Sequence, residues 1–357
     1  MASNSQVPSN SGASQAAASG LARARFARAT TAAALALLPA VFFLFSLTVG
    51  AYHVAPADVW SAIAAGVAGS ADNANDLAAN VIVQTRLPRV AAASLVGAGL
   101  AVAGAVFQGI FKNPLASSYT LGVSNGAGFG AGLAIIFSLG VAGIQLFAVG
   151  FGLAAVGLTF LIAARGRKDT VTLVLAGMLV GSLFASLVSL LKFVADPTEK
   201  LPQIVYWIMG TLSGVGIEEI VRILPLYVAC FVVIVLFRWR INVLSMGDSE
   251  ARSFGIDVRF DRTAVIAASS MLTALVVSVS GIIGWVGIVI PHLARMLVGP
   301  DFRRLIPASA SLGVCYLLVI DDICRTLTPT EIPIGVITGI VGVPMFLYFI
   351  YEKRVNW

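Results

Sequence analysis

Residues 142–164 read AGIQLFAVGFGLAAVGLTFLIAA, a run of 23 residues without a charged side chain. A helix needs about 20 apolar residues to cross the hydrocarbon core of a bilayer, so this run is long enough. It is also longer and more continuous than the strands of a transmembrane barrel. Because lipid tolerates only helices and closed barrels as spanning structures, the run predicts a transmembrane helix.

Apolar blocks of similar length recur along most of the chain, which is 58% hydrophobic, with a mean hydropathy of +0.94. Only 11% of its residues are charged, against about 25% in soluble proteins. The pattern predicts an all-α polytopic membrane protein with about ten transmembrane helices. We expect them at residues 31–51, 87–109, 119–139, 142–164, 170–194, 217–237, 263–281, 283–298, 306–324 and 332–351.

The N-terminal segment 1–30 is rich in Ser, Ala, Asn and Gln, and we expect a disordered cytoplasmic tail ahead of a membrane domain at 31–353. A cleaved signal peptide is the alternative, with Ala55-Pro56-Ala57 as a loose cleavage sequence. The apolar run from Thr31 to Tyr52 exceeds the ~7–15 residues of a signal core. We therefore expect the first span to be retained.

Basic residues predict the orientation. Ten spans place both termini on one side, and that side receives 17 of the 23 Lys and Arg residues. Positive residues concentrate in cytoplasmic loops, so both termini are expected in the cytoplasm. The net charge of +6 comes from short clusters between apolar blocks, which favours membrane orientation over nucleic-acid binding.

Glycines and the absence of certain motifs indicate how the helices pack and which sites the chain lacks. Glycines such as Gly97, Gly99 and Gly104, and those at 122–132, predict close helix packing. No Gly-x4-Gly-Lys-Ser/Thr pattern exists, so we expect the chain itself to bind no ATP. Two histidines, and three cysteines without metal-ligand spacing, predict no metal site.

The longest polar stretch on the expected cytoplasmic side is RWRINVLSMGDSEARSFGIDVRFDR, residues 238–262. Asp248 or Ser249 can cap a short helix with Glu250 in its first turn, and Gly255 can end it in a left-handed conformation. Such a helix, exposing Met246, Ala251 and Phe254, would suit docking of a cytoplasmic partner. A plain solvated loop is the alternative.

This segment resembles the cytoplasmic coupling loop of FecCD-type ABC importer permeases, which carry iron–siderophore, haem or cobalamin. Further stretches match the same family pattern, in order, over about residues 31–353: Arg86-Leu-Pro-Arg89, Gly104-Ala-Val-Phe-Gln108, Asn113-Pro-Leu-Ala116, Leu121-Gly-Val-Ser-Asn-Gly126, Gly281-Ile-Ile-Gly-Trp-Val-Gly287, Pro291-His-Leu-Ala-Arg295, Gly299-Pro-Asp301 and Glu331-Ile-Pro-Ile-Gly335.

The resemblance implies the type II ABC importer permease architecture: a homodimer of ten-helix subunits, two cytoplasmic ATP-binding subunits and an extracytoplasmic substrate-binding protein. ATP and Mg would bind to the ATPase subunits, and this chain would hold no cofactor. The coupling loop falls at 240–260. The residues implied to act on the ATPase are Gly247, Asp248, Glu250, Ala251, Arg252 and Gly255.

The resemblance also assigns residues on the outer side. Arg86, Arg89 and Arg325 match basic positions that receive acidic knobs of the binding protein; without the resemblance, anchoring at lipid headgroups is the better interpretation. The fifth and tenth spans would line the pathway at the dimer axis. The pathway residues implied in this way are Ser182, Ser186, Ser189, Gly339 and Gly342.

Three acids allow a different class of function. Asp321, Asp322 and Glu331 lie near the ends of spans, where acids are costly and often mark ion pathways, so a proton-coupled secondary transporter using Asp321 or Asp322 is the alternative. We expect instead that they pair structurally with Arg325. A membrane-embedded enzyme lacks a nucleophile–base pair, because His292 stands alone.

The sequence therefore predicts the permease subunit of an ATP-driven importer in a bacterial or archaeal cytoplasmic membrane, itself not an enzyme. The cargo would be a preformed metal chelate, and iron–siderophore has the largest weight in the family. A chain without a cluster of His, Cys or Met ligands suits the passage of an intact chelate.

Overall fold

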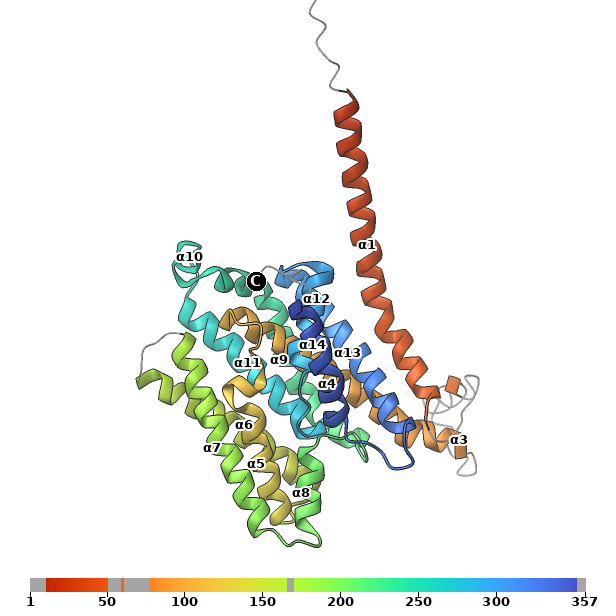
Figure 1. Ribbon diagram of the computed structural model, residues 1–357, viewed down its shortest axis with the longest axis vertical. Coiled ribbons are helices and arrows are strands. Elements are labelled where there is room, and N and C mark those ends of the chain that lie inside the picture. Colours follow the sequence, from red (N-terminus) through yellow and green to blue (C-terminus); the bar gives the residue numbers. More distant parts are fainter. Residues whose placement is uncertain (1–10, 51–58, 61–76, 166–169, 352–357) are drawn as a thin grey trace, which may run out of the picture.

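The computed structural model describes residues 11–50, 59–60, 77–165 and 170–351 (Figure 1). These residues form helices and connecting turns, with no strand among them. Residues 1–10 of the expected tail, Ala55–Ala57 and the last two residues of the expected membrane domain lie outside these ranges. The elements are α1 (Ser11–Thr48), α3 (Leu77–Asn80), the π-helix η1 (Val81–Arg86), α4 (Leu87–Phe111), the 3-10 helix η2 (Ser118–Leu121), α5 (Val123–Ile136), α6 (Gly140–Arg165), α7 (Thr170–Val194), α8 (Lys200–Ile208), α9 (Ile217–Met246), α10 (Asp248–Ser253), α11 (Val258–Ser280), α12 (Val286–Val298), α13 (Phe302–Thr326) and α14 (Ile334–Tyr351).

Each of the ten predicted spans has its helix. Seven are long and apolar enough to cross a membrane, and three apolar helices are shorter, at Val123–Ile136, Val286–Val298 and Ile334–Phe349. The shorter ones begin after non-helical turns, for example at Gly281–Trp285, where Gly281 has a φ of +67°. The apolar patterns therefore located the spans, whereas the turns that shorten three of them were not foreseen.

Two features differ from the sequence prediction. Helix α1 continues back to Ser11, so from that residue the tail is helical rather than disordered, in keeping with the high helix propensity of its alanines. Helix α8, nine residues between α7 and α9, had no predicted element. Its apolar residues are too few to span a bilayer, which is why a search for long runs passed over it.

Glycines let the central helix α4 touch its neighbours. A Cβ atom on Gly97 would lie 2.2 Å from the carbonyl oxygen of Gly313 in α13, and one on Gly104 would lie 2.0 Å from that of Gly287 in α12. Both distances are far inside van der Waals contact, so only glycine fits. The prediction that these glycines pack helices is confirmed at both positions.

The bundle has two ends that matter for function. Figure 1 shows α10, the start of α13 and the end of α14 at one end, and the start of α4 and the end of α13 at the other. We call them the α10 end and the Arg89 end. The 25 residues of α13 join them over about 37 Å, at 1.5 Å per residue.

Candidate functional site: the α10 segment and the Arg89 cluster

Helix α10 is delimited by a glycine on each side. Gly247 is the N-cap, with a φ of +154°, so neither Asp248 nor Ser249 caps the helix as the sequence suggested. At the other end Gly255 has a φ of +76°, and the amides of Gly255 and Ile256 donate to the carbonyls of Arg252 and Ala251. This is the Schellman arrangement, and the predicted left-handed end at Gly255 is confirmed.

Two side chains hold α10 and the adjoining end of α9 in place. Arg262 of α11 forms an ion pair with Asp248. The Arg262 guanidinium thereby lowers the pKa of the Asp248 carboxyl below its usual value. Lys112, just after α4, donates from its Nζ atom to the carbonyl of Met246 over 2.9 Å. The sequence analysis assigned no role to Arg262 or Lys112, because their partners lie 14 and 134 positions away in the chain, respectively.

A further link joins the α10 end of α9 to α13. The Asn242 side chain donates to Asp301 Oδ1 over 2.7 Å and accepts the amide of Phe302 over 2.8 Å. Asp301 also accepts the amide of Arg303 as the N-cap of α13. One amide group therefore connects the helix that leads into α10 with the helix that runs to the Arg89 end.

The surface of α10 mixes charge with apolar side chains. Asp248, Glu250 and Arg252 are exposed, and Met246 and Phe254 on either side of the helix are 60% and 57% exposed. Ala251 was predicted to be exposed, but it is fully buried against the bundle. The segment thus offers an anchored, partly apolar projection, which is a suitable shape for insertion into another protein.

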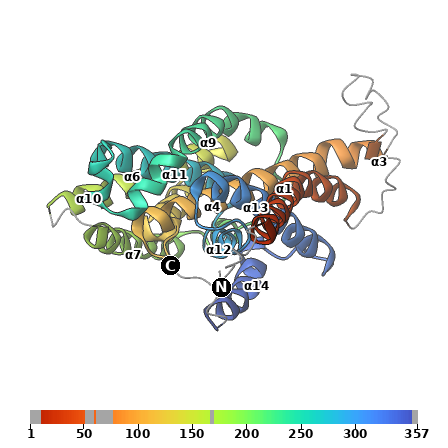
Figure 2. The same cartoon turned by 90° about the horizontal axis from the view of Figure 1, so that it is seen from above.

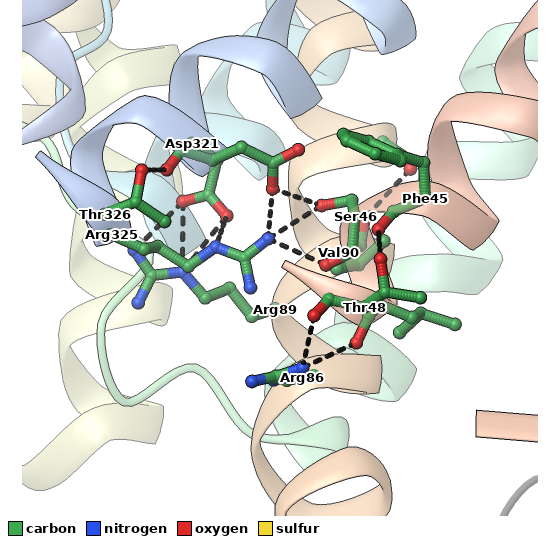
Figure 3. A network of polar contacts seen from close by, with 12 residues as sticks. Phe45, Ser46, Thr48, Arg86, Arg89, Val90, Asp321, Arg325 and Thr326 are labelled. Carbon is green, nitrogen blue, oxygen red and sulfur yellow. Dashed lines mark hydrogen bonds and ion pairs between the residues drawn. The ribbon is translucent and has the colours of Figure 1, made fainter. Parts of the chain in front are cut away.

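The Arg89 end carries a buried cluster of ion pairs (Figure 3). Arg89 Nη2 lies 2.9 Å from Asp321 Oδ1, and Arg89 Nη1 lies 2.7 Å from Glu331 Oε1. Arg325 Nε lies 3.3 Å from Asp321 Oδ2, and the Arg325 guanidinium also pairs with Asp322. The cluster joins the start of α4 to the end of α13 and to the turn before α14.

The same cluster fixes the end of α1. Ser46 Oγ donates to Asp322 over 2.6 Å and accepts from Arg325 Nη2 over 2.8 Å. Arg86 donates to the carbonyls of Leu47 and Thr48, which are among the last in α1 (Figure 3). A helix end has carbonyls without intrahelical partners, and Arg86 supplies donors to two of them.

These contacts bear on the roles predicted for the arginines. The expected pairing of acids with Arg325 is present for Asp321 and Asp322, but Glu331 pairs with Arg89 instead. Arg86, Arg89 and Arg325 are only 4–8% exposed. A guanidinium that already bonds to groups of its own chain has few donors left for the carboxylates of another protein. The docking role of the three arginines therefore stays a prediction, and their burial favours a structural role.

The predicted pathway residues separate into two groups. Ser182, Ser186 and Ser189 share an exposed face of α7. Gly342 of α14 is instead buried against Trp285, whose Cβ would lie 2.6 Å from an added Cβ. Figures 1 and 2 show α7 and α14 apart within the chain, so one subunit does not bring the two groups together.

Other polar residues in the bundle have packing partners. Asn125 donates to the carbonyl of Gly181 across α5 and α7, and Gln108 of α4 donates to the carbonyls of Gly287 and Ile288. The His292 ring lies 4.9 Å from that of Phe349 in α14. These contacts give the polar side chains inside the bundle packing roles.

The geometry can be compared with known proteins. The model of the FecCD transport family matches residues 37–352. The chain belongs to the FecCD transport family. The resemblance drawn from the coupling loop and the ordered motifs is therefore confirmed, and it covers nearly the span expected from the sequence.

Among FecCD-like relatives, the molybdate import system permease protein MolB of Haemophilus influenzae is 37% identical, over 90% of this chain and 95% of that protein. The cobalamin import system permease protein BtuC of Halobacterium salinarum is 40% identical, over 78% and 75%. A solved structure described as a metal-chelate type ABC transporter, in an inward-facing conformation, aligns with a TM-score of 0.80 and 37% identity, over 89% of this chain and 97% of that one. Family, fold and apolar helices together make this chain an integral membrane protein.

Proposed function

We propose that this FecCD-family chain is the permease subunit of an ATP-driven importer that moves a metal chelate into the cytoplasm. The observation that carries the proposal is α10: a short helix bounded by Gly247 and Gly255, braced by Arg262 and Lys112, and exposing Met246 and Phe254 at one end of the bundle. A permease without a nucleotide site needs such a contact to receive work from a separate ATPase.

The assembly we propose has two copies of this chain, two cytoplasmic ATPase subunits and an extracytoplasmic binding protein. The exposed serine face of α7 supports a second copy, since a pathway at a dimer axis would place that face opposite its counterpart. The sequence assigns 17 of the 23 basic residues to one side, which includes the α10 segment, and this supports a cytoplasmic position for that end and for both termini.

The cargo we propose is a preformed chelate, with iron–siderophore first and haem or cobalamin next. The solved transporter that aligns with this chain is described as of the metal-chelate type, and the two relatives described above are named for molybdate and cobalamin. The MolB similarity adds an oxyanion that the sequence interpretation did not consider. Transport assays should therefore include molybdate beside the chelates.

In the mechanism we propose, ATP binding closes the two ATPases and moves α10. Because Asp248 of α10 pairs with Arg262 of α11, and Lys112 holds the end of α9 from which α10 continues, the motion passes into the bundle rather than into a loose loop. Asn242 carries it on to α13. Transport then requires two global states that differ in affinity for nucleotide and for loaded binding protein.

Reconstitution tests the proposal. The chain, its candidate ATPase and its binding protein are placed in vesicles, and uptake is measured against ATP hydrolysis. Glu250→Arg on α10 should lower uptake per ATP hydrolysed by about tenfold or more. Glu218→Arg makes the same charge change at the Arg89 end of α9 and should keep the ratio. Unchanged coupling in Glu250→Arg would remove the role of α10.

The same vesicles address the secondary transporter. Within the described residues, Asp321 and Asp322 face arginines at ion-pair distance, and this geometry gives proton uptake no support. Uptake that ignores ATP and follows an imposed pH gradient would overturn the importer proposal. Uptake that needs ATP and ignores the gradient would dismiss the secondary transporter.

A further inference from the structure

A cavity of about 760 Å³ lies at the α10 end between α1, the last residues of α12 and the first turns of α13. Its α1 wall includes Thr31, Leu35 and Ala36, and Pro307 stands opposite on α13. The residues along both helices are mostly small, which leaves the space unfilled. A volume of this size is within the range of about 300–1,000 Å³ that small-molecule sites occupy.

A hydrogen bond joins α1 and α13 next to the cavity. One turn beyond Pro307, Ser311 Oγ donates to the carbonyl of Leu35 and joins the two helices. The cavity lies between α1 and α13, and Figure 1 shows the C-terminal part of α1 alongside α13, whereas its N-terminal part extends beyond the bundle. Neighbouring side chains of α1, such as Leu37 and Val41, are 65% and 59% exposed, which is typical of a lipid-facing surface.

Two arginines complete the wall. Arg303 and Arg304 line the cavity at the first turn of α13, and both residues are exposed. In the part of the chain that the structure describes, neither guanidinium forms an ion pair. The nearest acid along the chain, Asp301, accepts the backbone amide of Arg303 at 3.0 Å and the Asn242 amide at 2.7 Å, and it also interacts with the charges of Arg303 and Arg304. One carboxylate beside two guanidinium groups leaves a net positive charge at this wall, which can attract an anion.

We propose that this cavity binds an anionic phospholipid from the leaflet at the α10 end, with its phosphate at Arg303 and Arg304 and an acyl chain along Leu35 and Ala36. An apolar interior beside two guanidinium groups complements a molecule with one charged end and one apolar end. Arginine pairs with phosphate through two parallel hydrogen bonds, and basic pockets between membrane helices on the cytoplasmic side take acidic headgroups.

The charge of the proposed site is tested first. The full chain, purified in neutral detergent, is titrated with phosphatidylglycerol or phosphatidylcholine, and bound lipid is counted by native mass spectrometry. The variant Arg303→Gln/Arg304→Gln should bind phosphatidylglycerol about 10- to 30-fold more weakly, the loss expected for two basic residues near a headgroup. The control Arg238→Gln/Arg259→Gln removes two exposed arginines from the same end and should bind it unchanged.

The shape of the site is tested independently. Ala36→Trp would fill the cavity, whereas Ala33→Trp places the same ring on an exposed position of α1 that does not line it. Only Ala36→Trp should lower phosphatidylglycerol binding by tenfold or more. Glycerol 3-phosphate should not displace the lipid, because it lacks the acyl chain; displacement would indicate a simple phosphate site and overturn the proposal. Equal binding of phosphatidylcholine, or equal effects of both tryptophans, would also overturn it.

Discussion

The Arg89–Asp321 pair at one end of the molecule and the Asp248–Arg262 pair at the other lie in opposite surroundings. At the Arg89 end, the side chains of Arg89 and Asp321 are 7% and 0% exposed, and each has charged partners within the chain. At the α10 end, the side chains of Asp248 and Arg262 are 48% and 19% exposed. The first pair is enclosed by helices, and the second is open to solvent and to partners.

This difference indicates which charged residues stabilise the fold and which can contact a partner protein. A buried ion is costly to desolvate, so it must be matched inside the chain, and the loss of one partner leaves an uncompensated charge. An exposed ion pair contributes little to folding, because water and salt screen it. Its residues remain available to a second protein, and the following predictions test that contrast.

The largest expected effect is at the Arg89 end. Arg89→Met leaves Glu331 without its basic partner and Asp321 with Arg325 alone, and should destabilise the fold by about 3–5 kcal/mol. The free energy of unfolding is measured in detergent by denaturant titration. Arg238→Met, at an exposed position of α9, should stay within about 0.5 kcal/mol of the parent. A loss below about 1 kcal/mol for Arg89→Met would contradict the contrast between the two ends.

A smaller loss of stability is expected for a substitution of Arg86, one turn before Arg89. Arg86→Leu removes the donors to Leu47 and Thr48, and should cost about 1.5–3 kcal/mol because hydrogen bonds from a charged group are the stronger kind. Among the molecules that still fold, affinity for the binding protein should be unchanged. A selective loss of that affinity, with normal stability, would restore the docking role that the family resemblance implied.

The sequence was sufficient to locate the ten spans, and for reasons that are local. A span is a continuous apolar run of bilayer length, and the end of α10 is a glycine directly after the helix. Both patterns involve neighbouring residues, so the spans and the left-handed Gly255 were predictable. The side on which Ala251 lies was not, since it depends on how α10 sits against the rest of the bundle.

The charge pairing was only partly predictable, because it depends on distant segments. Arg325 and its acids lie within one turn of α13, and their pairing was foreseen. Arg89 meets Asp321 from 232 positions away, and no pattern of spacing indicates that contact. For the same reason, an arginine expected on the outer surface could not be distinguished by sequence from one buried between helices.

Asn242→Ala tests the link from the α10 end into α13. The substitution removes two hydrogen bonds, to Asp301 and from the amide of Phe302, and should cost about 1–2 kcal/mol. In the reconstituted importer it should also lower uptake per ATP hydrolysed while leaving α10 intact. Both are measured on the same preparation. Full coupling despite the loss of stability would mean that α13 does not receive the motion of α10.

The smallest effect is expected from the exposed pair at α10, and it depends on pH. The folded pKa of Asp248 is lowered by Arg262, so the pair stabilises α10 above the unfolded pKa of about 4, and the stabilisation disappears as pH falls through the folded value. The contribution should stay at or below about 0.5 kcal/mol, because the Asp248 side chain is half exposed and screened by solvent. Hydrogen exchange of the amides at 248–256 between about pH 3 and pH 6 measures it.

Arg262→Gln should remove this pH dependence, while leaving that of the Asp301 cap, whose carboxyl pKa is lowered chiefly by the backbone amide of Arg303. A pH effect as large as the loss from Arg89→Met would show that α10 is held as tightly as the buried cluster, and the contrast between the two ends would fail.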